Sequence, residues 1–443
     1  MKLFDTLKNI WKIDELKTRI LITVGFIAVY RLGTQIVLPG IDPQGLAALK
    51  TQTSDGVLGL LDMFSGGAFS NASIFALGIM PYISASIVVQ LLGIAVPYFQ
   101  RMQKEGESGH RKLNQITRYL TILILILQGS AYLTNLYMQV PAWAFALTGV
   151  FFKVSSIVIL AAGSMFVLWL GEKITDKGIG NGISIIIMIG IIARLPFSFV
   201  AELTSRVTEQ GGGLIAFIVE IVVLFFVFAG SIMLVQGTRK VPVQYAKRIV
   251  GNKQYGGVRQ YIPLKINAAG VMPIIFAQAI MLLPISFLKF ASTETLGGVG
   301  AALSDFTGFW YNFIFFILIV VFTYFYTAVT VNPMQMSEDM KKNGGFIPGV
   351  KPGKKTMEFL DTIMSRITLP GSIFLGLVAI LPAFATITGV NHSFAQFYGG
   401  TSLLILVGVV LDTLQQIESH LLMRHYDGLM KTGRIKGKAP GSY

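Results

Sequence analysis

Ionisable side chains within long apolar runs are the residues of this sequence that could carry chemistry inside a membrane. Arg31, Glu220 and Asp412 occupy such positions, and Glu418 lies near the end of a run. Transporters that couple solute movement to protons or ions use clusters of these groups near the centre of the bilayer. So few of them argue against ion-coupled transport, and we expect structural roles for Arg31 and Glu220.

No arrangement typical of an enzyme occurs in the sequence. It contains no cysteine, which excludes disulfides, thiol catalysis and thiolate metal sites. It has neither a glycine-rich phosphate loop ending in Lys-Ser/Thr nor a His-Glu-x-x-His zinc motif. Gly178-x-Gly180-x-Gly182 opens an apolar run and follows no strand, so we do not interpret it as a nucleotide-binding loop. We therefore predict no catalytic residue, no cofactor and no metal. The four histidines share no ligand spacing: His110, His392, His420 and His425.

Composition places the chain among multi-pass membrane proteins. Of its 443 residues, 53% are hydrophobic and 13% are charged, and the mean hydropathy is +0.66. A soluble domain has about 25% charged residues, so the charges here are too few to cover a globule of 48.4 kDa. Ten apolar runs are long enough to span a bilayer as helices: about 20–38, 74–97, 116–136, 150–170, 182–198, 214–236, 268–288, 309–331, 369–388 and 401–420.

Basic residues predict how these ten helices are oriented, because they accumulate on the cytoplasmic side. With the amphipathic segment 1–19 in the cytoplasm, the cytoplasmic segments hold 30 of the 36 Lys and Arg residues. Both termini, including the tail 421–443, are then cytoplasmic. Five helices in 20–198 and five in 199–420 have opposite orientations, which is the geometry of inverted repeats. We predict an all-α polytopic membrane protein with two inverted halves.

Residues 57–73 differ from the spanning runs. The apolar stretch 57–64 is far too short to cross a bilayer, and the small residues of 65–71 interrupt it before a full-length apolar run. This pattern predicts a re-entrant half-helix, which is stable only where protein or a water-filled cavity surrounds it. A helix that lies on the membrane surface is the alternative.

Two cytoplasmic loops, 237–267 and 332–367, carry more basic residues than orientation requires. The first has seven Lys and Arg residues and no acidic residue. Such a surface suits docking onto RNA phosphates or an acidic protein face. Binding to anionic lipid headgroups is the competing interpretation.

Seven stretches in order along nearly the whole chain are similar to the SecY family of protein-conducting channels. They are SGGAFSNASIFALGIMPYISASI (65–87), KEGESGHRK (104–112), WLGEKITDKGIGNGISIII (169–187), YAKR (245–248), PLKINAAGVMPIIFA (263–277), NGGFIPGVKPG (343–353) and GGTSLLILVGVVLD (399–412). The resemblance implies a bacterial cytoplasmic-membrane channel with a central pore. Such a channel translocates unfolded polypeptides and releases transmembrane segments laterally into the bilayer.

The resemblance also implies a seal at the pore waist. A ring of apolar residues resists water and ions by dewetting, and β-branched isoleucine helps to hold a defined aperture. Without the resemblance, lipid contact or core packing explains any single isoleucine. The implied ring is Ile83, Ile87, Ile187, Ile191, Ile275 and Ile405. The implied plug covers about 60–73 and includes Leu60, Leu61, Phe64, Ser65, Gly66 and Gly67.

Further residues take roles from the same resemblance. The lateral gate would lie between the second and third and the seventh and eighth helices, where packing is the alternative role for the polar residues Gln90, Gln128 and Gln278. Partner docking would involve Arg248, Lys253, Arg259, Lys351, Lys354 and Lys355. Lys351 and Asn252-Lys253 replace arginines usual in the family, and lysine lacks the planar bidentate contacts of arginine.

The partners that the resemblance implies are the small subunits SecE and SecG, the SecA motor, the ribosome through its RNA, signal sequences and nascent chains. YidC, SecDF and anionic lipids complete this set. An ion-coupled secondary transporter for small solutes is the alternative function. Scarce charge within the membrane and two large basic loops favour the channel.

Overall fold

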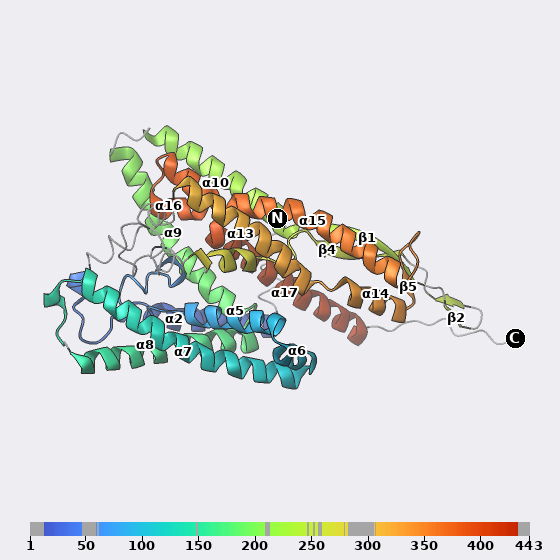
Figure 1. Ribbon diagram of the computed structural model, residues 1–443, viewed down its shortest axis with the longest axis horizontal. Helices are drawn as coiled ribbons and strands as arrows, with labels where there is room; N and C mark the ends of the chain where they lie inside the picture. Colours follow the sequence, from blue (N-terminus) through green and yellow to red (C-terminus); the bar gives the residue numbers. More distant parts are fainter. Residues whose placement is uncertain are drawn as a thin grey trace.

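Helices make up most of the computed structural model (Figure 1). The structure describes residues 13–46, 59, 62–147, 149–208, 213–245, 248–250, 253–255, 259–278, 280–281, 305 and 307–432. The N-terminal half contains α2 (Asp14–Gly33), η1 (Pro43–Leu46), α5 (Met80–Ala95), α6 (Pro97–Lys104), α7 (Glu107–Gln139), η2 (Ala142–Ala144), α8 (Val150–Lys177) and α9 (Gly182–Thr208). The C-terminal half contains α10 (Gly213–Gln236), α13 (Phe309–Thr330), α14 (Pro333–Lys342), α15 (Lys354–Ile387), α16 (His392–Ala395), η4 (Gln396–Tyr398) and α17 (Gly400–Thr432).

Seven helices of the described residues are long and apolar enough to cross a membrane. The number is eight if the bent pair Met80–Gly93 and Pro97–Gln103 is one span. Helix α2 and the helical residues 272–278 occupy two further positions at which the sequence predicts spans. The prediction of an all-α polytopic membrane protein is therefore confirmed.

Local sequence sets where α5 begins and ends. The apolar run starts at residue 74, but residues 74–79 form turns and the helix begins at Met80. Gly78 has φ +53°, a conformation that favours glycine. Pro81 follows in the first helical turn, where a backbone N–H would have no partner within the helix, so proline is tolerated there. At the other end Val96 is extended, as the residue before a proline prefers, and Pro97 starts α6.

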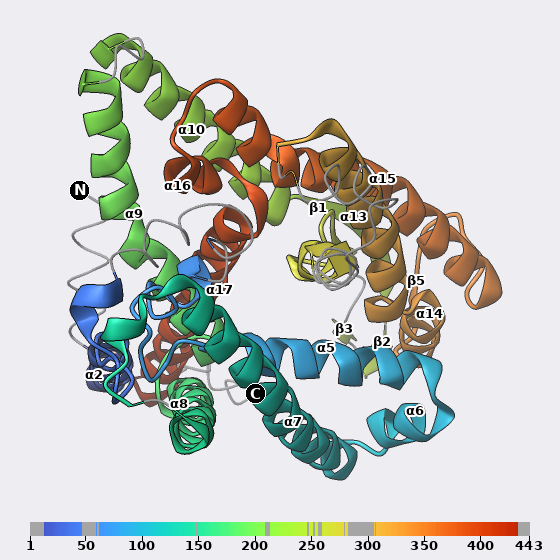
Figure 2. The same ribbon diagram turned by 60° about the vertical axis from the view of Figure 1, so that its left-hand side comes forward.

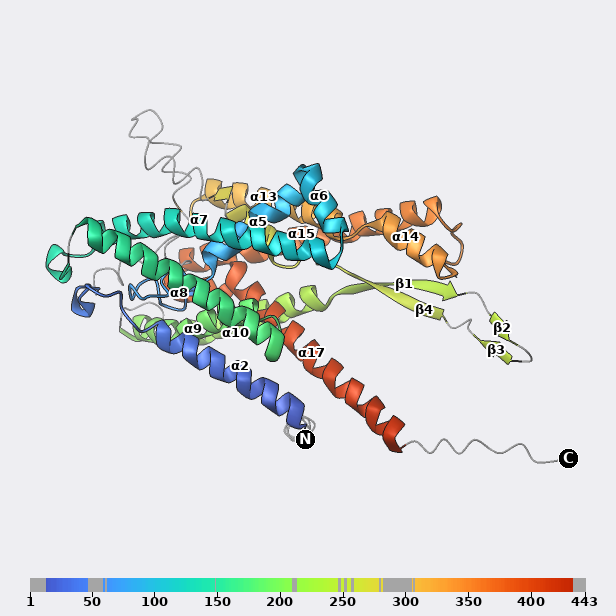
Figure 3. The same cartoon turned by 90° about the horizontal axis from the view of Figure 1, so that it is seen from below.

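The two basic loops contain a small sheet that we did not predict. Strand β1 (Thr238–Tyr245) pairs antiparallel with β4 (Arg259–Lys265) from Thr238↔Lys265 to Gln244↔Arg259, and with β5 (Gly345–Phe346) at its end. Strands β2 (Arg248–Val250) and β3 (Lys253–Tyr255) form a second hairpin, which projects from the helical body (Figure 3). Apolar side chains of β1, β4, α14 and α15 and of the residue after β5 form one core that joins the two loops: Val241, Val243, Leu264, Met340, Ile347, Leu360 and Met364.

Helix α9 connects the two halves of the molecule. Among the described elements, the most extensive packing between the halves involves α9, which contacts α10, α16 and α17 (Figure 2). Each half also has a core of its own, around Leu136 and Leu160 in the first and around Ile319 and Leu375 in the second. Two packed bodies joined mainly along one helix can separate elsewhere without losing their own cores.

Candidate functional site

The described part of the plug segment, residues 62–73, is packed inside the molecule. One helical turn at 62–64 is followed by turns, and Met63 and Ala68 are buried. Gly66 and Gly67 have φ of +65° and +91°, which glycine adopts without strain. Leu60 and Leu61 lie outside the described residues.

Backbone meets backbone where the plug segment contacts α9. A Cβ atom on Gly66 would lie 2.9 Å from Cα of Gly190, and a Cβ on Gly190 would lie 2.8 Å from the carbonyl oxygen of Phe64. Neither distance is tolerated by a real side chain, so this contact requires glycine on both sides. The segment is therefore fitted closely against α9.

Four of the six predicted ring isoleucines share one apolar cluster with the plug segment. Ile187 and Ile191 from α9 and Ile405 from α17 are buried in this cluster, and half-buried Ile83 from α5 packs against it. Met63 and Ala68 of the plug segment belong to the same cluster, and Phe64 packs against it. Three helices from both halves thus converge on the plug through isoleucine side chains.

The other two predicted ring residues lie outside this cluster. Ile87 of α5 is buried and Ile275 is half-buried, but neither is part of the cluster. Ile87 follows Ile83 by one helical turn on the same face of α5. Its role in the ring, like that of Ile275, stays a prediction.

Polar contacts also hold the plug segment. Asp62 forms an ion pair with Arg194 of α9, and Arg194 also donates a hydrogen bond to Ser70 Oγ at 2.7 Å. Arg31 of α2 donates to the carbonyl oxygen of Gly66 at 3.0 Å. Tyr30 donates its hydroxyl proton to the carbonyl oxygen of Ser65 at 3.1 Å. Sequence reasoning singled out Arg31 but missed Asp62 and Arg194.

A buried ionic network, also missed, joins α9 to α10 and α16. Arg206 Nε donates to Glu202 Oε1 at 2.9 Å, and Arg206 Nη2 lies 2.5 Å from Glu220 Oε1. The backbone N–H of Asn391 donates to Glu202 Oε2 at 2.7 Å. Glu220 is thus paired in the described structure, and its structural role stays a prediction. The network fixes α9 where the two halves meet.

The three predicted gate glutamines are half-buried but are not bonded to one another. Within the described residues no hydrogen bond joins Gln90, Gln128 and Gln278, and Gln90 Oε1 is buried without a partner. Gln278 lines a cavity of about 30 Å³ together with Tyr311 and Gln396. Their assignment to a gate stays a prediction.

The predicted docking residues lie in the two basic loops, in strands β2, β3 and β4 and at or just before the start of α15. Lys351, Lys354 and Lys355 are exposed, and Lys355 Nζ lies 2.9 Å from Glu358 Oε2. In the strands, Arg248 pairs with Tyr255 and Lys253 with Val250, which places Lys253 at the turn of the projecting hairpin. Arg259 begins β4, opposite Gln244.

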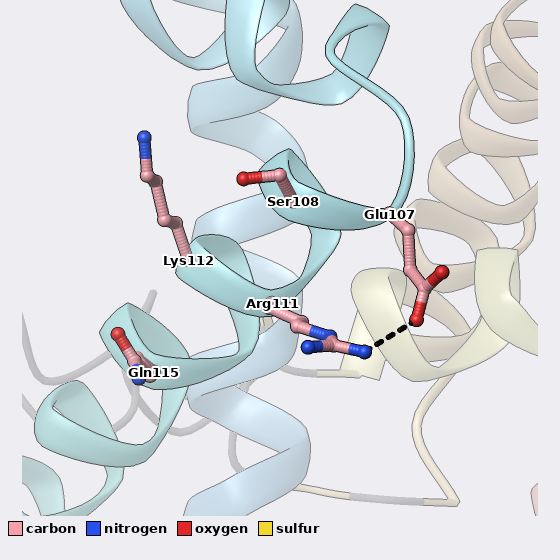
Figure 4. A pocket seen from close by; sticks show the side chains of 5 residues that line it. All are labelled: Glu107, Ser108, Arg111, Lys112 and Gln115. Carbon is pink, nitrogen blue, oxygen red and sulfur yellow. Dashed lines mark hydrogen bonds and ion pairs between the residues drawn. The ribbon is translucent and has the colours of Figure 1, made fainter.

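A hollow of about 350 Å³ lies at the start of α7 (Figure 4). Unlike the apolar cluster, it is lined by polar and charged side chains. Arg111 Nη2 pairs with Glu107 Oε1 at 2.7 Å, and both side chains are largely exposed. Ser108, Lys112 and Gln115 complete the lining. Exposed pairs one helical turn apart contribute little stability, so this is an ordinary solvated helix end.

Comparisons with known proteins agree with this architecture. The SecY family model matches residues 73–414. Protein translocase subunit SecY of Streptomyces scabiei is 41% identical over 436 residues, covering 95% of this chain and 98% of the relative. The Mycobacterium bovis subunit is 40% identical over 435 residues, covering 94% and 97%.

Solved structures share the fold. A structure of a protein conducting channel has a TM-score of 0.63 at 18% identity and covers 94% of this chain and 95% of its own. Sec61 in the canine ribosome-channel complex has a TM-score of 0.59, with the same identity and coverage. With a family model over most of its length and relatives matched end to end, this chain belongs to the SecY family.

Proposed function

We propose that this chain forms a protein-conducting channel whose pore is closed by the isoleucine ring and the plug segment in series. The observation that carries this function is the apolar cluster in which Ile187, Ile191 and Ile405 meet Met63 and Ala68. A narrow apolar constriction excludes water and therefore ions, yet it yields to a passing polypeptide. No covalent chemistry is needed, so the chain is not an enzyme.

Lateral release of transmembrane segments would use the side of the molecule away from α9. The most extensive packing between the halves runs through α9 among the described elements, and the Arg206 network strengthens that side. We propose that the halves part between α5 and α7 on one side and residues 272–278 and α13 on the other. Gln90, with its unpartnered buried oxygen, is a polar residue on that path.

Partners would bind at the two basic cytoplasmic loops, 237–267 and 332–367. The exposed lysines near Lys351 and the basic sequence of the hairpin that carries Lys253 would offer positive charge to ribosomal RNA or to the SecA motor. The canine Sec61 structure, which shares the fold, is part of a ribosome-channel complex. SecE, SecG, signal sequences, YidC, SecDF and anionic lipids are the further proposed partners, and the bacterial cytoplasmic membrane is the proposed location.

Reconstituted translocation tests the proposed function. The chain is incorporated into proteoliposomes with SecE and SecG, and SecA, ATP and an unfolded precursor are added outside. We expect the precursor to become protected from protease in a manner that depends on its signal sequence. A correctly folded complex that protects no precursor, although SecA is active, would contradict the proposal.

Reporter fusions test the proposed orientation, because 30 of the 36 basic residues lie in the segments assigned to the cytoplasm. Fusions after Tyr137, Gln210 and Asn391 should report an outer location. Fusions after Lys253 and Lys351 should report a cytoplasmic one. A single reversed fusion among the five would disprove the ten-helix topology.

Charge reversal tests the docking surface. The substitutions Lys253→Glu and Lys351→Glu should weaken binding of ribosomes and of SecA at least several-fold at low salt, because each lysine would attract RNA phosphates or an acidic protein face and a glutamate would repel them. Lys153→Glu, at the start of α8, is the matched control. Equal affinities for variant and parent at both low and moderate salt would mean that these lysines only set topology.

A further inference from the structure

The plug segment is held by charged groups that the apolar seal does not require. The Asp62 carboxylate is 9% exposed and pairs with Arg194, and its Oδ1 also accepts the backbone N–H of Ser70 at 2.8 Å. Arg194 donates in turn to Ser70 Oγ at 2.7 Å. One arginine of α9 thus holds both ends of the plug turn, from residue 62 to residue 70.

A second arginine approaches the same turn from α2. Arg31 donates to the carbonyl oxygen of Gly66 at 3.0 Å, and a Cβ on Gly66 would lie 2.8 Å from Arg31 Nη1. A Cβ on Gly67 would lie 3.2 Å from Arg194 Nε. The two glycines therefore let two guanidinium groups close on the plug backbone from neighbouring helices. Larger residues at either position would push them away.

These interactions exist only while the plug is in place. If the plug leaves, Asp62 is separated from Arg194, and both charges must find water or other partners. An interaction made in the closed state alone shifts the equilibrium toward that state by its full differential free energy. A signal segment that opens the channel has to overcome this amount in addition to the apolar seal.

We propose that Asp62 and Arg194 form a latch that positions the plug and sets how strong a signal segment must be to open the channel. Arg31 supports the latch through Gly66. This inference rests on the proposed function and assigns positioning residues that determine its selectivity. Because the latch depends on charge, it differs from the isoleucine ring, whose contacts are apolar and non-directional.

The test compares Asp62→Asn, Arg194→Gln and the double variant in the complete complex with SecE, SecG and SecA. The first readout is transport of a precursor with a crippled signal sequence, relative to the intact precursor. We expect each single variant to raise this ratio roughly tenfold, the effect of removing one hydrogen bond between charged groups. The double variant should add little, because partners in one pair are not additive.

The second readout needs no transport. The chain has no cysteine, so Ala68→Cys introduces a single thiol at a position that is 0% exposed. We expect an aqueous alkylating reagent to modify this thiol faster in both latch variants than in the parent. If the parent complex does not transport the intact precursor, the proposed function fails. The alkylation rates still test the latch in that case, because they do not depend on transport.

Arg118→Gln is the matched control, since it breaks the exposed Arg118–Glu172 pair at 2.6 Å, remote from the plug. It should leave both readouts unchanged. If Arg194→Gln does not fold, Arg194→Lys retains the charge without the planar fork and should give a smaller change in the same direction. Unchanged alkylation and selectivity in folded variants, or fully additive effects in the double variant, would overturn the latch.

Discussion

Replacing Ile191 and Ile405 together with serine should make the resting channel conduct ions. Both side chains are buried in the cluster that holds the plug segment. Two hydroxyl groups at the constriction would stabilise water there, and a barrier lowered by about 1.4 kcal/mol raises the rate of ion passage tenfold. We therefore expect the conductance of the purified protein in planar bilayers to rise by roughly tenfold or more.

Position-matched controls separate this effect from general damage. Ile192 and Val410 neighbour the ring on α9 and α17 but are 39% and 38% exposed. Their serine variants should therefore not raise the conductance of the resting channel. If the ring variant does not fold, the threonine pair keeps the β-branched shape and supplies the same hydroxyl groups. A folded ring variant that conducts no ions, even with residues 60–73 deleted, would contradict the assignment of the ring.

The substitution Gly190→Val should displace the plug without touching a ring residue. Any Cβ at position 190 would lie 2.8 Å from the carbonyl oxygen of Phe64 and 3.2 Å from the backbone nitrogen of Gly66, so the plug backbone must move. Overpacking of this kind commonly costs about 1–3 kcal/mol. Because the cost falls on the closed state, the resting conductance and the transport of precursors with weak signals should both rise.

Gly25→Val is the control for this variant. Gly25 also lies within a helix, α2, but a Cβ there meets nothing within 4 Å. Both variants introduce the same β-branched residue into a helix, so their helix-propensity costs cancel. Equal conductance of the two variants would show that the plug does not rest on Gly190 in the closed channel.

The sequence predicts the helices because each spanning segment is determined locally by apolar length. It also predicts that residues 65–71 interrupt a helix, since small residues and paired glycines are local signals. The sequence did not predict the strands β1 and β4, because Pro242 and Pro263 lie within them and proline is rare inside strands. The structure accommodates Pro242 where β1 is paired with β4 but not with β5.

Contacts that depend on the three-dimensional arrangement could not be predicted. Asp62 and Arg194 are far apart in sequence, and nothing in their local spacing indicates an ion pair. Glu202 and Arg206 differ in this respect, because their separation by one helical turn is a local signal from which their ion pair could have been predicted. The contact of Gly180 could not be predicted, because its backbone N–H donates to Gln416 Oε1 of α17 at 2.9 Å, far away in the sequence.

The most direct test of the channel places a translocating polypeptide inside the ring. A precursor with one cysteine is arrested halfway by a folded domain at its end, and disulfide formation is measured with the otherwise cysteine-free chain carrying Ile191→Cys or Ile192→Cys. Ile191 is 0% exposed and Ile192 is 39% exposed. We predict a cross-link to position 191 that requires the signal sequence and SecA, and little or none to position 192. Absence of the cross-link at 191 while transport is active, or equal cross-linking at both positions, would contradict passage through the ring.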